Sequence, residues 1–223
     1  ACHARGIAVI LDVVYNHAFG QSPLAQLYWD QAQNRPSANN PWLNPVAKHD
    51  FNVGYDFNHE SPQTKLFVKR VLSWWMETYG IDGFRFDLSK GFTQNNTLGN
   101  TAAWGQYDQS RINILQEYAD HIWSIDPDAY LILEHFADNT EEIELSSRGM
   151  MLWGNMTTAY GQGSKGFGGS DVSNTWHVNR GWADPHLVAY MESHDEERLM
   201  YKNLSAGNSA PGYNIKELKT ALS

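Results

Sequence analysis

The sequence predicts an α/β fold built around a parallel sheet, and two observations lead to this prediction. Short runs of apolar, β-branched residues alternate with longer amphipathic segments, which is the pattern of strand–helix–strand units. The polar side chains that could do chemistry follow directly after these runs, at Asn16-His17, Asp87, Glu134 and Asp195. In a (β/α)8, or TIM, barrel the carboxyl ends of all strands meet on one rim, where active sites lie. We therefore expect a barrel fold with its chemistry at that rim.

The first predicted strand covers residues 7–14, a continuous apolar run of the kind that is buried on both faces. Residues 18–60 contain no long periodic segment, so we expect an inserted subdomain there. The next helix is expected to begin at Ser61-Pro62, a cap followed by a first-turn proline, and to end at Gly80. This helix is predicted to carry the apolar residues Leu66, Phe67, Val71, Trp74, Trp75 and Tyr79.

The rest of the chain continues the alternation. Strands are predicted at residues 81–87, 129–133 and 187–191, and a helix capped by Asp108 or Ser110 lies between the first two of these. The remaining predictions are loops at 91–106 and at the glycine-rich 161–169, a short helix at 141–145, a weaker strand at 150–153 and a closing helix at 211–222.

The composition of the 223 residues argues against several classes of function. A net charge of −9 does not suit a nucleic-acid partner, because phosphate binding needs Lys and Arg. The single cysteine, Cys2, permits neither an intrachain disulfide nor a cysteine-rich metal site. No run of 18 apolar residues is present, so no membrane span is expected. These features leave secreted, periplasmic and cytoplasmic locations open.

The strand-end carboxylates permit two kinds of chemistry. Taken alone, Asp87 could cap a helix or pair with Arg85, which points to the same side of the predicted strand. Three carboxylates on one rim, however, allow metal-assisted hydrolysis or glycoside hydrolysis by a carboxylate pair. The metal chemistry calls for clustered histidines, as in His-x-His or His-Glu-x-x-His, and the sequence contains neither motif. We therefore favour glycoside hydrolysis, with Arg85 keeping Asp87 ionised.

Four separated motifs resemble those of the α-amylase family of retaining glycoside hydrolases, and they occur in the family's order. They are DVVYNH at 12–17, GFRFDLSK at 83–90, Glu134 after an LIL run, and ESHD at 192–195, with YDFN at 55–58 resembling a short motif of the inserted subdomain. The resemblance extends to about Arg198. It implies that residues 1–223 are part of a catalytic TIM-barrel domain, a fragment that spans about strands 3 to 7 with a short inserted subdomain, 18–60, after strand 3.

The resemblance also implies a role for each residue. Asp87 would be the nucleophile, Glu134 the general acid and then base, and Asp195 would stabilise the distorted sugar. The substrate would be an α-glucan of the starch or glycogen type. Contacts with the substrate, or with the nucleophile in the case of Arg85, are implied for His17, Arg85, Lys90 and His194.

No cofactor is required by this chemistry, but many members of the family bind calcium between the barrel and the subdomain. Asn16 matches one calcium ligand of the family. Calcium-binding members often have histidine directly after the lysine of the second motif, where this chain has Gly91.

Other functions fit the same motifs. A debranching (pullulanase-like), branching or transglycosylase member of the family would carry them too. A non-catalytic barrel used as a binding protein usually lacks one of the carboxylates, and all three are present. An incomplete barrel would have open sheet edges, which invite pairing with another chain, and the missing strands, which complete the sugar site, could leave the isolated fragment inactive.

Overall fold

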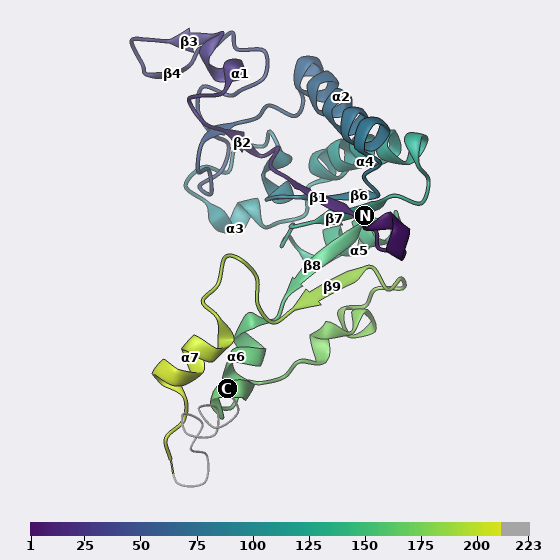
Figure 1. The fold of residues 1–223 in the computed structure, drawn as a ribbon. Helices are drawn as coiled ribbons and strands as arrows, with labels where there is room; N and C mark the ends of the chain where they lie inside the picture. Colours follow the sequence, from purple (N-terminus) through teal and green to yellow (C-terminus); the bar gives the residue numbers. More distant parts are fainter. Residues whose placement is uncertain (211–223) are drawn as a thin grey trace. The chain divides into compact units, whose positions relative to one another are not determined.

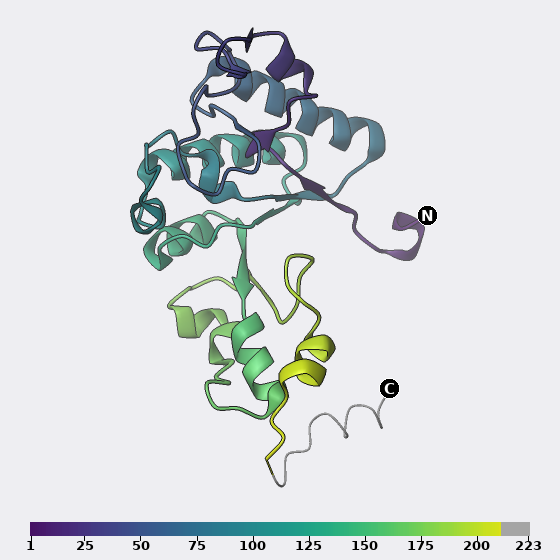
Figure 2. The ribbon, with the colours of Figure 1, turned by 90° about the vertical axis from the view of Figure 1, so that its left-hand side faces the viewer.

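The computed structural model describes residues 1–210, so the predicted helix at 211–222 lies outside the described residues. The chain divides into two compact units, the first covering Ala1–Leu152 and the second beginning at Trp153. Figures 1 and 2 show the elements of both units in two perpendicular views. Among the described residues, no helix combines the length and apolar character that crossing a membrane requires.

The first unit is built on a parallel sheet. Its strands are β1 (Ile10–Val13), β6 (Gly83–Phe86), β7 (Tyr130–Leu133) and the first residues of β8 (Met151–Asn155), in this spatial order. Within the described residues β1 pairs on one side only, so the expected open edge is confirmed, whereas pairing of this edge with another chain stays a prediction.

Two long helices cover the sheet of the first unit and lie side by side in Figure 1. Helix α2 (Pro62–Tyr79) begins after the Ser61 cap and ends at Gly80, which has a φ of 63°, as predicted. Helix α4 (Gln109–Ile125) is capped by Asp108, whose side chain accepts hydrogen bonds from the backbone of residues 110 and 111. Helix α5 (Asn139–Ser147) packs against α4.

The apolar residues expected on α2 are not the ones that the structure buries most deeply. Leu66, Trp74 and Tyr79 are each more than half exposed. Apolar residues surround most of this helix, and burial follows the row with a spacing of four that faces the core. That row consists of Thr64, Val68, Leu72 and Met76.

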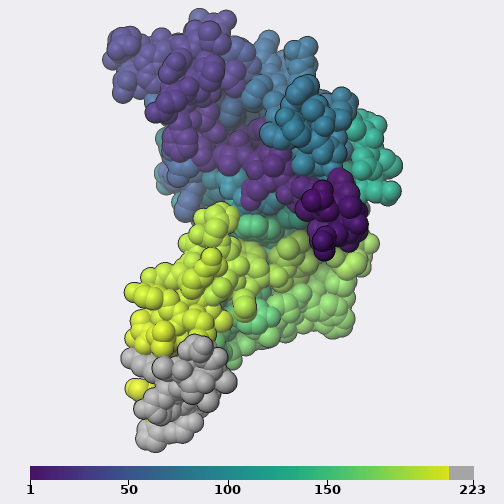
Figure 3. All heavy atoms as spheres, in the orientation of Figure 1, coloured from purple at the N-terminus to yellow at the C-terminus, as the bar shows by residue number. Residues whose placement is uncertain are grey.

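Short elements fill the connections. Residues 18–60 contain α1 (Pro23–Gln26) and small antiparallel pairs around a core of Ala25, Leu43 and Phe57. The segment 91–106, predicted as a loop, includes a helical turn. The pairs and turns are β2 (His17–Ala18) with β5 (Tyr55–Asp56), β3 (Trp29–Asp30) with β4 (Arg35–Pro36), η2 (Ser89–Phe92), α3 (Thr101–Trp104) and η1 (His3–Arg5), which is exposed at the start of the chain in Figure 3.

In the second unit the end of β8 lies beside β9 (Leu187–Tyr190), and α6 (Thr157–Lys165) packs against α7 (Leu199–Ala206). Two short 3₁₀ turns, η3 (Ser173–Thr175) and η4 (His177–Arg180), precede β9. The loop predicted at 161–169 was wrong in its first half, because α6 continues to Lys165. Packing against α7, with a hydrogen bond from Ser164 to Asn203, outweighs the low helix propensity of the glycines.

Candidate active site

The register of the sheet brings two predicted catalytic residues to adjacent strand ends. Val13, Phe86 and Leu133 are paired across the sheet, so Asp87 and Glu134 each follow at the same edge. The backbone N–H of Asp87 still donates to the carbonyl of Val13, and that of Glu134 to Phe86, both at 3.0 Å. The two carboxylates therefore start from a rigid, hydrogen-bonded sheet.

Arg85 connects the carboxylates of this edge. Its side chain is almost completely buried, and its Nη1 donates to Asp12 Oδ1 and to Asp87 Oδ1, each at 2.8 Å. Nη2 of the same guanidinium donates to Glu134 Oε2 at 2.7 Å. The predicted pairing of Arg85 with Asp87 is thus present, and Glu134 shares the same cation.

The backbone is strained next to both carboxylates. Leu88, directly after Asp87, has a φ of 43°, and Phe136, two residues after Glu134, has a φ of 52°. Residues with side chains rarely adopt this left-handed region, and such conformations concentrate at functional sites. At Leu88 the conformation has a visible result, because its N–H donates to Glu134 Oε2 at 2.9 Å.

His17 lies near the same edge. Burial lowers its pKa, and the nearby charge of Asp87 opposes this effect only in part. The neutral ring accepts a hydrogen bond at Nδ1 from the Asn16 side chain, 3.3 Å away, so its proton sits on Nε2. The exposed ring of Phe19 packs edge-on at 5.6 Å from the ring of His17. His17 can therefore offer an N–H donor beside an aromatic surface.

Lys90 is turned toward the protein. Its Nζ donates to the carbonyl of Phe136 at 2.8 Å and lies 4.2 Å from the ring centre of Trp104. Burial, followed by the nearby charge of Arg111, lowers the pKa of Lys90. One of its three N–H donors is therefore given to the backbone.

The remaining predicted residues, His194 and Asp195, belong to the second unit. They form a pair with 3.6 Å between His194 Nε2 and Asp195 Oδ1, and both side chains are about 60% exposed. The ring of Trp153 lies edge-on to His194 at 6.3 Å. The structure thus brings Asn16, His17, Arg85, Asp87 and Glu134 together in the first unit, and His194 with Asp195 in the second.

A buried polar cluster lies behind this edge. Asn16, His49 and Asp56 are at most 1% exposed, and Asn16 Oδ1, Asp56 Oδ1 and both ring nitrogens of His49 have no hydrogen-bond partner. His49 Nε2 lies 3.8 Å from Asp56 Oδ1. Gly91 closes the cluster, since a Cβ there would collide with Asn16 Oδ1 and His49 Nε2. Buried polar atoms without partners are rare and need an explanation.

A calcium ion is one explanation for the unpartnered oxygens Asn16 Oδ1 and Asp56 Oδ1. Carboxylate and amide oxygens are the ligands that calcium prefers. The unpartnered oxygens of Asn16 and Asp56 therefore fit the predicted ion, and His49 is the atypical member of the cluster. The described residues contain no group of three or more His, Cys, Asp or Glu side chains arranged to hold a metal.

Replacing Asp56 with Asn is expected to stabilise the protein at pH 8 but not at pH 4. Burial raises the pKa of Asp56 to about 7 from 3.8, so the folded state binds the extra proton between these values. The free energy of unfolding of the wild type therefore falls as the pH rises through this window, by on the order of 4 kcal/mol. Urea unfolding in EDTA at both pH values measures the difference. An equal difference between the two proteins at pH 4 and pH 8 would contradict this account.

A second buried network was not predicted from the sequence. Ser89 Oγ lies 2.9 Å from His135 Nδ1, His135 Nε2 lies 2.8 Å from Glu141 Oε1, and Glu141 forms a bidentate pair with Arg111 at 2.6 Å. Arg111 and Glu141 are 30 residues apart, and no periodic pattern relates them. The one signal in the sequence is Arg111, a charged residue on the otherwise apolar side of α4.

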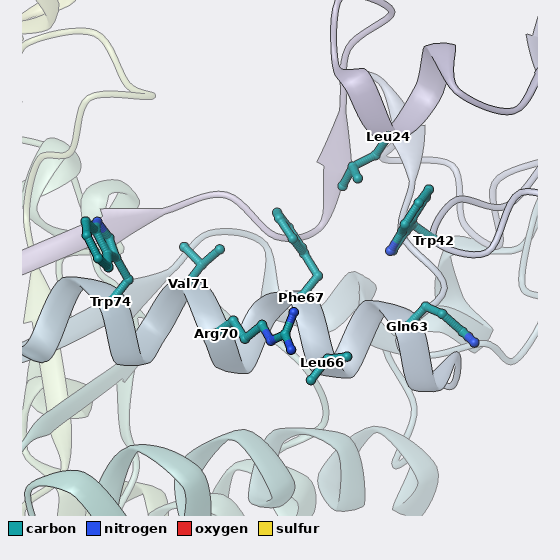
Figure 4. Close-up of a pocket in the computed structure, with 8 residues that line it drawn as sticks. All are labelled: Leu24, Trp42, Gln63, Leu66, Phe67, Arg70, Val71 and Trp74. Carbon is teal, nitrogen blue, oxygen red and sulfur yellow. The ribbon is translucent and has the colours of Figure 1, made fainter.

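An apolar cavity of the first unit lies elsewhere. It has a volume of about 430 Å³ and runs along α2, as Figure 4 shows. None of the predicted site residues lines it, so we do not assign the active site to it. Its lining residues are Leu24, Trp42, Gln63, Leu66, Phe67, Arg70, Val71 and Trp74.

No protein-family model matches the chain. Comparison with known proteins nevertheless finds amylases and debranching enzymes. Alpha-amylase 3 of Dictyoglomus thermophilum is 26% identical over 164 residues, which is 66% of this chain and 30% of that protein. Isoamylase of Pseudomonas amyloderamosa is 31% identical over 121 residues, 51% of this chain and 15% of isoamylase. The structure of type I pullulanase from Bacillus subtilis str. 168, complexed with maltose, covers 93% of this chain and 30% of its own, with 21% identity and a TM-score of 0.61. The chain thus spans less than a third of each relative, and the structural likeness shows a shared fold.

Proposed function

Because its relatives are glycoside hydrolases of the α-amylase family, we propose that this protein is a retaining glycoside hydrolase that acts on α-glucosidic bonds of starch- or glycogen-type glucans. One observation supports the proposal most directly. The carboxylates of Asp87 and Glu134 accept hydrogen bonds from one buried guanidinium, so they are held close together at the strand ends. A short separation of two carboxyl groups is what a double displacement requires.

In the proposed reaction Asp87 attacks the anomeric carbon as the bond to the leaving oxygen breaks. Glu134, in its protonated form, gives its proton to that oxygen, and a covalent glycosyl ester on Asp87 results. In the second half Glu134 takes a proton from water, the oxygen of that water attacks the anomeric carbon, and Asp87 is released. Two inversions give net retention of configuration.

The other residues bind and orient the sugar in this proposal. His17 donates from Nε2 to a sugar hydroxyl, and Lys90 uses its remaining donors at a neighbouring subsite. Asp195 and His194 bind hydroxyls of the reacting sugar and favour its oxocarbenium-like form. Arg85 keeps Asp87 ionised and ready to attack.

The proposal extends to the chain's place in the barrel. We assign β1, β6 and β7 to barrel strands 3, 4 and 5, and β9 to strand 7, with residues 18–60 as the subdomain inserted after strand 3. Calcium would be held by Asn16 Oδ1 and Asp56, where it would neutralise a buried carboxylate and tie the subdomain to the end of β1. Calcium chloride in place of EDTA in the urea experiment at pH 8 should then stabilise the wild type and leave the stability of Asp56→Asn unchanged.

The second candidate is a debranching enzyme that cleaves α-1,6 bonds. It is favoured by the names of several relatives, which include isoamylase, glycogen debranching enzyme and pullulanase. Parallel assays on amylose, pullulan and glycogen separate the two, since a debranching enzyme attacks pullulan and leaves linear amylose intact. Binding of these glucans without any cleavage would instead support a non-catalytic binding protein.

Replacing Glu134 with Gln is expected to lower kcat/KM on these glucans by about 10²- to 10⁴-fold, because general acid–base catalysis is lost. Reducing-end release measures the effect. The matched control is Glu117→Gln, which removes a carboxylate that pairs with Lys65 and Lys69 away from the strand ends and should leave activity unchanged. Full activity of Glu134→Gln would contradict the proposed function.

A further inference from the structure

The three residues that follow Asp87 donate hydrogen bonds to Glu134 and to the loop that follows it. The Leu88 N–H donates to the Glu134 carboxylate at 2.9 Å. The Ser89 N–H donates to the Glu134 carbonyl, also at 2.9 Å, and Lys90 Nζ donates to the Phe136 carbonyl at 2.8 Å. Three consecutive residues thus bind the loop of the second carboxylate, and both segments contain a left-handed residue.

Ser89 is the central member of this contact. Its side chain is fully buried, and its Oγ lies 3.0 Å from the Glu134 carbonyl oxygen and 2.9 Å from His135 Nδ1. The single hydroxyl proton is shared between these two acceptors. Together with its N–H, Ser89 therefore makes two contacts with the Glu134 carbonyl and fixes the backbone from which that carboxylate projects.

The side chains behind Ser89 keep its hydroxyl in place. Burial lowers the pKa of His135, so the ring is neutral at pH 7. Burial alone would raise the pKa of Glu141, but hydrogen bonds from His135 and Arg111 hold it below its usual value. Glu141 is then an ionised acceptor, His135 gives it the Nε2 proton, and Nδ1 remains an acceptor for Ser89. The hydrogen bonds behind His135 thus have a defined direction, and the Ser89 proton is shared between the Glu134 carbonyl and His135 Nδ1.

We infer that Ser89 is a positioning residue for the proposed acid–base carboxylate of Glu134. The inference rests on the proposed function and deepens it. Ser89 cannot touch the sugar, because it is fully buried, so its effect passes through the backbone of Glu134. The loss of Ser89 should therefore lower the rate most when the leaving group needs a proton from Glu134. It should lower the rate least when the leaving group departs without a proton.

The test compares two substrates in Ser89→Ala. With the glucan that the wild type cleaves in the assays above, amylose or pullulan, the leaving oxygen needs protonation, and kcat/KM should fall about 10- to 100-fold through misplacement of the carboxylate. With α-maltosyl fluoride, whose fluoride leaves without a proton, kcat/KM should stay within about twofold of the wild type. Equal losses on both substrates, or no loss on either, would overturn the inference.

Two further variants keep the result interpretable. Ser73→Ala removes another serine–histidine hydrogen bond of 2.9 Å, between Ser73 of α2 and His121 of α4. This variant should leave kcat/KM unchanged on both substrates. Ser89→Cys keeps the buried volume but replaces a strong donor with a weak one, so it should reproduce the substrate difference if the alanine variant does not fold. Inactivity of the full-length protein on both substrates would refute the proposed function, whereas activity without the substrate difference refutes only the role of Ser89.

Discussion

Replacing Asp87 with Asn should abolish hydrolysis of α-glucans, with a loss of about 10⁴-fold or more in kcat, because the amide cannot form the glycosyl ester. The variant should still fold, since the amide oxygen can accept the hydrogen bond from Arg85 Nη1. Reducing-end release from pullulan and amylose measures the loss. Near-normal activity of the variant would show that Asp87 only pairs with Arg85.

Asp12 provides the matched control for this prediction. Its Oδ1 accepts from the same Nη1 at the same distance, 2.8 Å. If Asp87 has a purely structural role, Asp12→Asn and Asp87→Asn should lower the activity equally. If Asp87 is the nucleophile, Asp87→Asn should lower the activity far more than Asp12→Asn.

Azide gives a second readout with α-maltosyl fluoride. In Asp87→Gly azide should displace fluoride directly and form the β-azide with inverted configuration, while in Glu134→Ala it should open the glycosyl ester and form the α-azide. If Asp87→Gly gives the α-azide and Glu134→Ala the β-azide, then Glu134 is the nucleophile and Asp87 the acid–base residue.

Replacing Arg111 with Met should lower the free energy of unfolding by about 3–5 kcal/mol, because it leaves the buried Glu141 carboxylate without its cation. We expect no other variant proposed for this protein to be destabilised more. Arg111 is 1% exposed, and it also donates to the carbonyls of Lys90, Trp104 and Gln106. Urea unfolding monitored by tryptophan fluorescence measures the change.

The double variant Arg111→Met with Glu141→Gln shows how much of that loss is electrostatic. The amide oxygen of Gln can still accept from His135, and neither position of the former ion pair carries a charge, so about half of the lost stability should return. If the double variant is no more stable than Arg111→Met, the loss comes from the three carbonyls and from packing.

Much of the fold of the first unit could be predicted because its signals are local. Ser61, Asp108 and Gly80 mark the ends of α2 and α4 through their own backbone and side-chain chemistry. The apolar runs predicted the bounds of β6 and β7 to within two residues. The convergence of Asp87 and Glu134 followed from the rule that parallel strands end on one side.

The parts that could not be predicted depend on contacts distant in sequence. Which side of α2 is buried is decided by its neighbours, since apolar residues lie on several sides. Helix α6 forms through glycines because α7 packs on it. The bond between Arg111 and Glu141 joins two helix starts, and a single sequence contains no information that pairs them.

The left-handed backbone at Leu88 and Phe136 has a consequence for protein engineering. Glycine adopts such angles without strain, so Leu88→Gly and Phe136→Gly are obvious candidates for raising thermal stability. Both positions, however, hold the loops that carry Asp87 and Glu134, and a glycine would loosen them. We expect thermostable variants of this protein to be found mainly away from these two positions, where stability and turnover do not compete.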